Sequence, residues 1–331
     1  MGVKMNNLNG KNILLTGGTG SFGKAFAKKI LESSEINKLI IYSRDELKQF
    51  EMANYLQSKN IRFFLGDVRD RDRLDFAAKD VDIIIHAAAM KQIPASEYNP
   101  MEAIKTNIIG AENIVSVAIR NQVENVIALS TDKAANPANL YGATKLCSDK
   151  LMIAGNTLAG SRNVKFSVVR YGNVLGSRGS VIPFFKSKIK DGFVPITDPR
   201  MTRFWLTLNQ GVDFVIKCLN RMKGGEIFVP KIPSFKVTDV ANVVCPGVPI
   251  KIIGIRPGEK LHEIMITEDD SYNTFEYNDY YAIYSPTRIV NYHPMENGIP
   301  VEPGFRYSSD TNSNWFTLET FRQILIDNEI I

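Results

Sequence analysis

Cysteine and histidine are both scarce, with three of each in 331 residues. Cys147, Cys218 and Cys245 are far apart and form no Cys-x-x-Cys pair, which excludes a disulfide framework and the common zinc-binding patterns. The three histidines are scattered as well, so we expect no metal. This cysteine usage is typical of a reducing compartment, and we predict a cytoplasmic location.

The chain has no large excess of one charge, because 40 Lys and Arg face 35 Asp and Glu and the formal net charge is +5. Without a basic block, this balance disfavours nucleic acid and leaves small anions as expected partners. Long apolar runs are lacking too. The longest, residues 81–90, contains Asp82 and His86 and is shorter than the ~18 residues that cross a membrane. Residues 1–11 are too polar for a signal peptide, so we expect no membrane contact.

Short apolar segments rich in β-branched residues alternate with helical patterns in the first half of the chain. The predicted strands are Asn12–Thr16, Lys38–Tyr42, Ile61–Leu65, Val81–Ile85, Asn125–Leu129 and Lys165–Arg170. The predicted helices lie near Phe22–Glu32, Asp45–Gln57, Pro100–Asn121 and Tyr141–Leu158. Strands that are apolar on both faces belong in a parallel sheet between helix layers. We therefore predict an α/β fold with a doubly wound parallel (Rossmann) sheet.

The alternation stops at about residue 175, where shorter elements and frequent prolines begin. We predict a first domain at 1–175 and a smaller α+β substrate lobe at 176–206 and 231–331. Parts of 207–230 are expected to join the first domain, with Thr207 capping a helix at Leu208–Asn220. A short helix near Trp315–Leu325 is expected to dock at the end of the chain.

A glycine-rich loop follows the first predicted strand and leads into the first helix, with the sequence TGGTGSFG at 16–23. Glycines at 17, 20 and 23 permit a tight turn and close backbone approach to a pyrophosphate, which the helix N-terminus then binds. This context predicts a dinucleotide site rather than a plain turn. The loop residues expected at the cofactor are Gly17, Thr19, Gly20, Ser21, Phe22 and Gly23.

The end of the second strand bears on the choice between NADP and NAD. An arginine there accommodates the 2′-phosphate of NADP, whereas a carboxylate binds the ribose hydroxyl of NAD. Ser43 and Arg44 come first, with Lys48 one helical turn further on, and Asp45 can instead cap the next helix. We therefore predict NADP over NAD. The later strand ends add Asp67 and Val68 beside the adenine and Ala87, Ala88 and Ala89 along the cofactor.

A tyrosine and a lysine four residues apart follow the fifth strand. Tyr141 and Lys145 project from one helix face, since they are i and i+4. At ~4 Å and an effective dielectric of ~20, the Lys145 charge would favour the Tyr141 phenolate by about 4 kcal/mol, or roughly three pKa units. Such pairs often arise by chance, but this one accompanies the glycine loop and Ser130-Thr131. We expect Tyr141 to act as a base.

These motifs resemble the extended short-chain dehydrogenase/reductase family. More narrowly, the chain is similar to the C5-inverting UDP-N-acetylglucosamine 4,6-dehydratases that begin the pseudaminic acid pathway. The similar stretches include YSRDELKQFEMA (42–53), HAAAMK (86–91), ALSTDKAANPANLYGATK (128–145), RYGNVLGSRGSV (170–181), ITDPRMTRFW (196–205) and IIGIRPGEKLHE (252–263). Asp132-Lys133 stands where glucose-type dehydratases have Asp-Glu. Gln92 departs from the pattern, because the inverting relatives usually have His there.

The resemblance implies an internal redox elimination on a UDP-sugar and assembly into a homo-oligomer. Tyr141, with Lys145, would deprotonate the 4-hydroxyl, and Thr131 would bind the same oxygen. Lys133 would take the C5 proton while Asp132 protonates the leaving 6-hydroxyl, which requires a neutral lysine and a protonated aspartate. Burial favours both of these states, although the attraction between the two side chains opposes them.

The resemblance also implies further contacts. Thr106 and Val174 are added to the cofactor site. The substrate would meet Lys91, Thr131, Asn173, Arg178, Ser180, Val181, Thr197, Met201, Arg203, Arg256 and Glu259, with the arginines as anion clamps. Release of a 5,6-ene, a C5-retaining dehydratase, a 4-epimerase and a non-catalytic NADP sensor remain alternatives. An epimerase has no use for an acid–base pair at C5 and C6.

Overall fold

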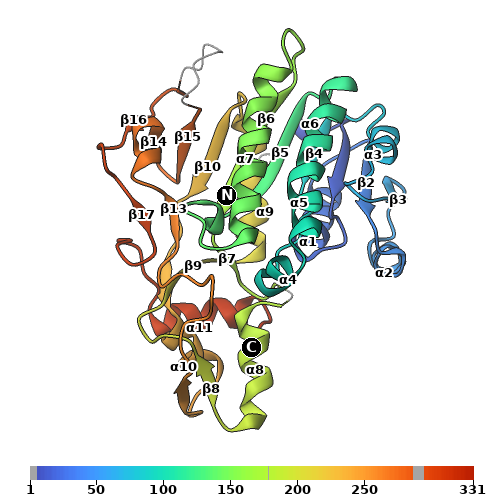
Figure 1. The fold of residues 1–331 in the computed structure, drawn as a ribbon. Coiled ribbons are helices and arrows are strands. Elements are labelled where there is room, and N and C mark those ends of the chain that lie inside the picture. The colour runs from blue at the N-terminus through green and yellow to red at the C-terminus, as the bar shows by residue number, and fades with distance from the viewer. Residues whose placement is uncertain (1–5, 178, 286–293) are drawn as a thin grey trace.

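The computed structural model describes residues 6–177, 179–285 and 294–331. Their main sheet has ten strands in the order β16-β14-β15-β10-β6-β5-β4-β1-β2-β3 (Figure 1). The parallel strands are β1 (Asn12–Thr16), β2 (Lys38–Ser43), β3 (Ile61–Leu65), β4 (Ile83–His86), β5 (Asn125–Thr131), β6 (Lys165–Tyr171) and β10 (Glu226–Pro230). Chain order reverses between β1 and β4, where a doubly wound sheet opens a crevice for ligands. The predicted doubly wound α/β fold is confirmed.

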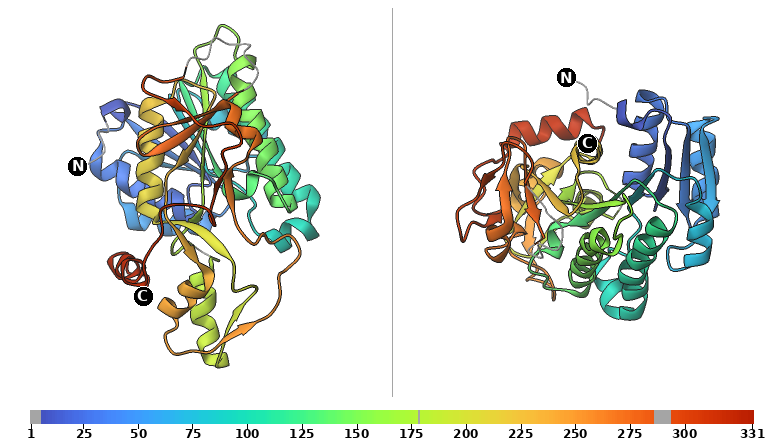
Figure 2. Two further views of the ribbon diagram at one scale, coloured as in Figure 1. Left: turned by 90° about the vertical axis from the view of Figure 1, so that its left-hand side faces the viewer. Right: turned by 90° about the horizontal axis from the view of Figure 1, so that it is seen from above.

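Helices cover both faces of this sheet (Figure 2, right). One face carries α1 (Ser21–Ser33) packed against α9 (Leu208–Arg221). The other carries α3 (Arg71–Ala77), α6 (Gly110–Arg120) and α7 (Leu140–Leu158), with α6 in contact with both α3 and α7. The remaining helices of this part are α2 (Glu46–Leu56), α4 (Ile93–Tyr98) and α5 (Pro100–Ile104). Thr207 caps α9 as predicted, because its hydroxyl accepts from Gln210 N and the Gln210 side chain accepts from Thr207 N.

The helix predicted at Pro100–Asn121 is interrupted. A π-helical turn, η2 (Lys105–Ile109), separates α5 from α6. Asn107 lies in this turn, and its side chain accepts from Met90 N at 2.8 Å and donates to Met90 O at 2.9 Å. Through Asn107, the wider turn is hydrogen-bonded to the loop that follows β4. Single π-helical turns are frequent at functional sites.

The sheet extends further than predicted, because residues assigned to the second lobe join it. Antiparallel strands β15 (Tyr280–Tyr284), β14 (Thr274–Glu276) and β16 (Ile299–Pro300) continue from β10. Tyr281 and Tyr284 bury their rings against this edge. A hairpin can join the edge of a parallel sheet through short connections. Its alternation of apolar and polar residues looks the same in the sequence whether the hairpin joins this sheet or belongs to a separate lobe.

The smaller lobe lies below the sheet in Figure 1 and has its own apolar core. Its helices are α8 (Val181–Lys188), α10 (Val237–Val244) and α11 (Leu318–Asp327). Its strands are β7 (Asn173–Val174), β8 (Val194–Ile196), β9 (Thr202–Leu206), β11 (Ser234–Lys236) and β12 (Ile250–Ile252), and its short turn is η4 (Ile189–Asp191). The pair β13 (Ile264–Ile266) and β17 (Tyr307–Ser308) packs into the main core beside the sheet, where the turn η5 (Asp269–Asn273) contacts β15 (Figure 1). The terminal helix begins after Thr317 rather than at Trp315, because Thr317 is its N-cap.

Among the described residues, no helix combines the length and apolarity needed to cross a membrane. In the same part of the chain, His, Cys, Asp and Glu side chains form no group of three that could hold a metal ion. Cys147, Cys218 and Cys245 are all free thiols.

Candidate active site

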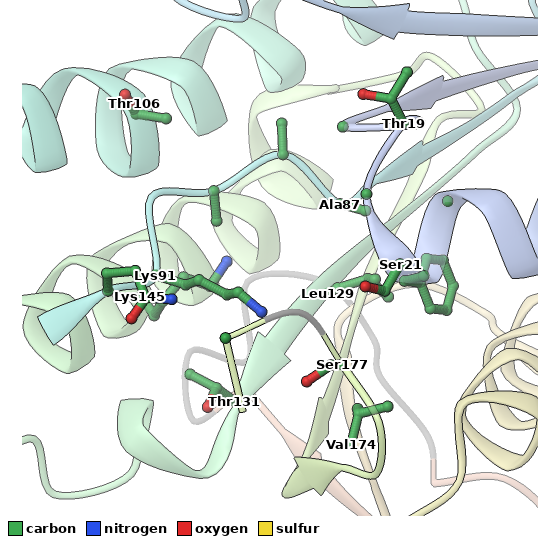
Figure 3. Close-up of a pocket in the computed structure, with 18 of the residues that line it drawn as sticks. Thr19, Ser21, Ala87, Lys91, Thr106, Leu129, Thr131, Lys145, Val174 and Ser177 are labelled. Atoms are coloured by element: carbon green, nitrogen blue, oxygen red, sulfur yellow. The ribbon is translucent and has the colours of Figure 1, made fainter. Parts of the chain in front are cut away.

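A cavity of about 1020 Å³ opens at the C-terminal ends of the parallel strands and reaches the first turn of α8. Every residue predicted to bind the cofactor lines it, as do all five predicted catalytic residues. Thr19 and Ser21 lie on one side of the cavity in Figure 3, and Thr131, Lys91 and Lys145 on the other. The phosphate loop and the catalytic residues therefore face one shared space.

The glycine loop packs too tightly for larger residues at two positions. Gly17 has φ +64°, and a Cβ there would lie 2.8 Å from Ala88 Cα. A Cβ on Gly23 would lie 2.2 Å from the carbonyl oxygen of Gly18. Gly20 is the N-cap of α1 and offers no capping side chain, so the N-terminal N–H groups of this helix face the cavity edge. Such a loop suits a pyrophosphate.

Charged residues after β2 and β3 surround the other end of this cavity. Asp45 is the N-cap of α2, since its carboxylate accepts from Lys48 N at 3.0 Å and pairs with the Lys48 ammonium. Arg44 keeps 63% of its side chain exposed and lies 3.6 Å from Asp67. Burial alone would raise the pKa of Asp67, but hydrogen bonds from Arg69 hold it below its usual value. Arg44 is more exposed than Lys48 and Arg69, the other cations at this end.

Tyr141 and Lys145 are buried on the first two turns of α7, which Asn139 caps by accepting from Gly142 N. Burial raises the pKa of Tyr141 to about 12, while Lys133 and Thr131 act to lower it. Burial also lowers the pKa of Lys145. The expected stabilisation of the phenolate by Lys145 is therefore outweighed in this structure by burial, and the nearby cation that lowers the Tyr141 pKa is Lys133.

Asp132 and Lys133 form the turn η3 (Asp132–Ala134) directly after β5. Lys133 Nζ lies 3.1 Å from Asp132 Oδ1 and 3.2 Å from Glu263 Oε1. Thr131 also donates to Asp132 Oδ1, at 2.9 Å, so in this structure its hydroxyl is engaged beside the site predicted for the sugar oxygen. Asp132 Oδ2 is buried and has no hydrogen-bond partner among the described residues.

The protonation of this pair agrees with the predicted roles for only one member. Burial raises the pKa of Asp132, as an acid requires. For Lys133, burial acts to lower the pKa, but Asp132 and Glu263 raise it above the usual value. The attraction of the two carboxylates therefore raises the Lys133 pKa by more than burial lowers it. The resting lysine is an ammonium rather than the expected free amine.

Three functional neighbours have no clear signal in the sequence. Glu263 stands 130 residues from Lys133. His86 is buried at the end of β4, where its Nδ1 lies 2.8 Å from Thr16 Oγ1, and burial together with Lys145 lowers its pKa to about 3. Asn107 holds both Met90 and Thr144. Only spatial proximity, which local motifs do not encode, brings these residues to the site.

The residues predicted to bind substrate divide into two groups. Those that line the cavity are Lys91, Thr131, Asn173, Ser180 and Val181, together with Gln92. Those that do not are Thr197, Met201, Arg203, Arg256 and Glu259. Arg178 lies outside the described residues. Buried Asn173 Oδ1 and Ser180 Oγ lack hydrogen-bond partners within the described part of the chain and are available to a ligand.

Arg203 and Arg256 lie outside the cavity, and the donors of Arg203 are occupied by backbone carbonyls. Arg203 donates to the carbonyls of Thr202, Lys260 and Leu261 at 2.7–3.0 Å. Arg256 is exposed and lies 4.0 Å from Glu259. Arginine prefers forked contacts, and here backbone carbonyls rather than an open pocket satisfy the Arg203 donors.

Comparison with known proteins gives similarity over nearly the whole chain. A family model described as polysaccharide biosynthesis protein matches residues 13–285. A UDP-N-acetylglucosamine 4,6-dehydratase (inverting) of Campylobacter jejuni is 56% identical over 330 residues, which cover 97% of this chain and 99% of that protein. A UDP-glucose 4-epimerase of Rickettsia canadensis is 42% identical over 290 residues, 85% of each chain. The X-ray structure of Pen from Bacillus thuringiensis superposes with a TM-score of 0.91 at 37% identity, covering 98% of this chain and 99% of that one.

Proposed function

Because the chain belongs to the polysaccharide biosynthesis protein family, we propose that it is a UDP-N-acetylglucosamine 4,6-dehydratase that inverts C5. The observation that carries this is the Asp132-Lys133 pair, with Asp132 buried and Lys133 partly exposed, in the same cavity as Tyr141 and the glycine loop. One molecule of water is lost, and the sugar is oxidised at C4 and reduced at C6. The product is the 4-keto-6-deoxy sugar that the pseudaminic acid route begins from.

NADP is the proposed cofactor. The close Gly17–Ala88 approach and the start of α1 suit its pyrophosphate, and the exposed Arg44 side chain can reach a 2′-phosphate. Asp45 supports this choice, because its carboxylate already caps α2 and pairs with Lys48. When bound, the nicotinamide accepts a hydride and later returns it.

Tyr141 is the proposed base for the 4-hydroxyl. Its hydroxyl faces the cavity beside Thr131, and Lys133 lowers its pKa against the effect of burial. Lys145 is buried four residues after Tyr141, so its amine lies on the same face of the helix as the Tyr141 hydroxyl. Proton transfer to Tyr141 prepares C4 for oxidation, after which the 4-ketone acidifies the C5 proton.

Asp132 and Lys133 are proposed to carry out the elimination with a single internal proton. Transfer across their 3.1 Å hydrogen bond converts the resting ion pair into a carboxylic acid and an amine. Lys133 then takes the C5 proton, the C5–H electrons form the C5–C6 double bond, and the 6-hydroxyl leaves with the Asp132 proton as water. Lys133 is again an ammonium and Asp132 a carboxylate, so the pair returns to its starting state.

Lys91, Asn173, Ser180 and Val181 are proposed to hold the UDP-sugar, because they line the cavity next to the catalytic residues. Asn173 Oδ1 and Ser180 Oγ need partners that a sugar hydroxyl or amide can supply. A cytoplasmic location and a homo-oligomeric state are proposed with this function.

A 4-epimerase is the second candidate, because the Rickettsia canadensis relative carries that name. The Asp132-Lys133 pair argues against it, since epimerisation at C4 requires neither removal of the C5 proton nor protonation of the 6-hydroxyl.

The product formed from UDP-N-acetylglucosamine in D₂O, identified by NMR, tests the proposal. We expect a 4-keto-6-deoxy sugar with one deuterium at C5 and inverted configuration there. Retained C5 configuration, a released 5,6-ene, or UDP-N-acetylgalactosamine without deuterium would each contradict the inverting dehydratase.

A further inference from the structure

Glu263 is a buried carboxylate that the segment before β13 places beside the catalytic pair. It directly precedes β13, and only 3% of its side chain is exposed. Its backbone is fixed on both sides by Ser309, since Glu263 N donates to Ser309 Oγ at 2.9 Å and Ser309 N donates to Glu263 O at 2.8 Å. The backbone that carries this carboxylate is therefore fixed next to the catalytic pair.

The contacts of Glu263 converge on Lys133. Its Oε1 lies 3.2 Å from Lys133 Nζ, and Arg203 Nε is farther away, at 3.8 Å. Its Oε2 accepts no hydrogen bond from the described residues and lies 3.9 Å from Lys260 Nζ. Burying a carboxylate with one unsatisfied oxygen is costly, so this placement needs an explanation beyond packing.

We propose that Glu263 is the positioning residue for the elimination: it fixes the Lys133 amine between two carboxylates and sets the pH at which that amine can act as a base. The role rests on the proposed function, because it concerns the step in which Lys133 takes the C5 proton. Glu263 stays ionised throughout, and the proton moves only between Lys133, Asp132 and the substrate. It is a counter-ion for the ammonium and does not touch the reacting carbon.

Several charged groups face Lys133 from different elements, and any titration reflects all of them. They are Asp132 in η3, Tyr141 on α7, Arg203 on β9, and Lys260 and Glu263 in the segment before β13. An attraction at 3.2 Å with an effective dielectric of about 20 corresponds to roughly four pKa units before screening by solvent in the cavity. Removal of the Glu263 charge is therefore expected to lower the titration midpoint of Lys133 by at least about one pH unit.

The direct test is acetylation of Lys133 as a function of pH, with acetic anhydride as the probe and peptide mass spectrometry as the readout. Lys133 lines the cavity and is 23% exposed, so the reagent can reach it. The full-length wild type is compared with Glu263→Gln and with Glu268→Gln, an exposed position that loses the same charge. A lower midpoint in Glu263→Gln alone supports the inference. An unchanged midpoint, or an equal shift in Glu268→Gln, overturns it.

The kinetic test measures kcat as a function of pH. On the alkaline side of this profile, kcat is expected to fall because Asp132 and Lys133 lose the proton that they share. In Glu263→Gln this fall is expected at lower pH with little change in KM, and Glu263→Asp, which keeps the charge but withdraws it by one methylene group, should shift the fall in the same direction by a smaller amount. Should the Gln variant not fold, Glu263→Asp carries the comparison, and a midpoint equal to the wild type then refutes the role. The acetylation needs no substrate, so a wild-type product that disproves the dehydratase leaves the charge coupling separately measurable.

Discussion

Replacement of Lys133 by Met is expected to destabilise the protein as well as stop elimination. The substitution keeps most of the volume but leaves Asp132 and Glu263, which are 1% and 3% exposed, without the cation between them. Removal of one partner from a buried ion pair costs about 3–5 kcal/mol. Glu263 retains Arg203 at 3.8 Å and Lys260 at 3.9 Å, so we expect the lower end, about 3 kcal/mol. That is a large part of a typical total of roughly 5–15 kcal/mol.

The loss should depend on pH in a defined direction. In the wild type, burial opposes the Glu263 charge, but Lys133 and Arg203 hold its pKa below the usual value, so its contribution is present above about pH 4 and fades as the pH falls. In Lys133→Met, the buried carboxyls are expected to have raised pKa values, and the folded state then binds more protons than the unfolded one. Stability of the variant therefore rises as the pH falls towards about 4, and the gap from the wild type narrows.

Urea unfolding at pH 8 and pH 5, followed by tryptophan fluorescence, measures this gap. Lys150→Met is the matched control, because Lys150 is exposed on the same helix as Tyr141 and a surface change typically costs less than about 0.5 kcal/mol. A Lys133→Met variant as stable as Lys150→Met at pH 8 would refute the reasoning. So would a gap that is the same size at both pH values.

Three further outcomes are expected. Tyr141→Phe should abolish oxidation at C4 while UDP-sugar binding, measured by calorimetry, changes little, and near wild-type turnover would remove Tyr141 as the base. Arg44→Asp should weaken NADP binding far more than NAD binding in fluorescence titrations, whereas equal losses would count against the assignment. Burial raises the pKa of Tyr280 and Tyr281 to about 12, above an unfolded value of about 10, so folding stability should be full below pH ~10 and fall as the pH rises to ~12. Urea midpoints that are equal at pH 8 and pH 11 would contradict this.

The sequence predicted those features whose cause is local. Each parallel strand of the first half was predicted within one or two residues, because buried parallel strands are continuous apolar segments. Glycine was predicted to permit a tight turn at positions 17 and 23, and in the structure a Cβ at either position would lie 2.8 Å or less from neighbouring backbone. The i and i+4 spacing placed Tyr141 and Lys145 on one buried face of α7. Their catalytic roles remain predictions.

Features that depend on distant contacts could not be predicted. Arg203 matches an anion clamp in type, but the carbonyls of Lys260 and Leu261 occupy its donors. The Lys133 charge state depends on Glu263, whose proximity follows from the packing of β13 rather than from a motif. From Asp132-Lys133 alone, burial was expected to lower the pKa of Lys133 and the attraction to Asp132 to raise it. The second carboxylate, Glu263, adds to the attraction, and the pKa is raised.

The acid–base group is completed by a segment far from it in the sequence. Lys133 and Asp132 follow β5 in the main sheet, whereas Glu263 directly precedes β13, which packs against η3. Two hydrogen bonds fasten that segment to the catalytic loop, from Lys260 Nζ to Ala135 O at 2.6 Å and from Asn139 Nδ2 to Gly258 O at 2.8 Å. Lys133 therefore owes its second carboxylate to a segment that is distant in the sequence, and these two hydrogen bonds hold that segment against the loop that carries Lys133.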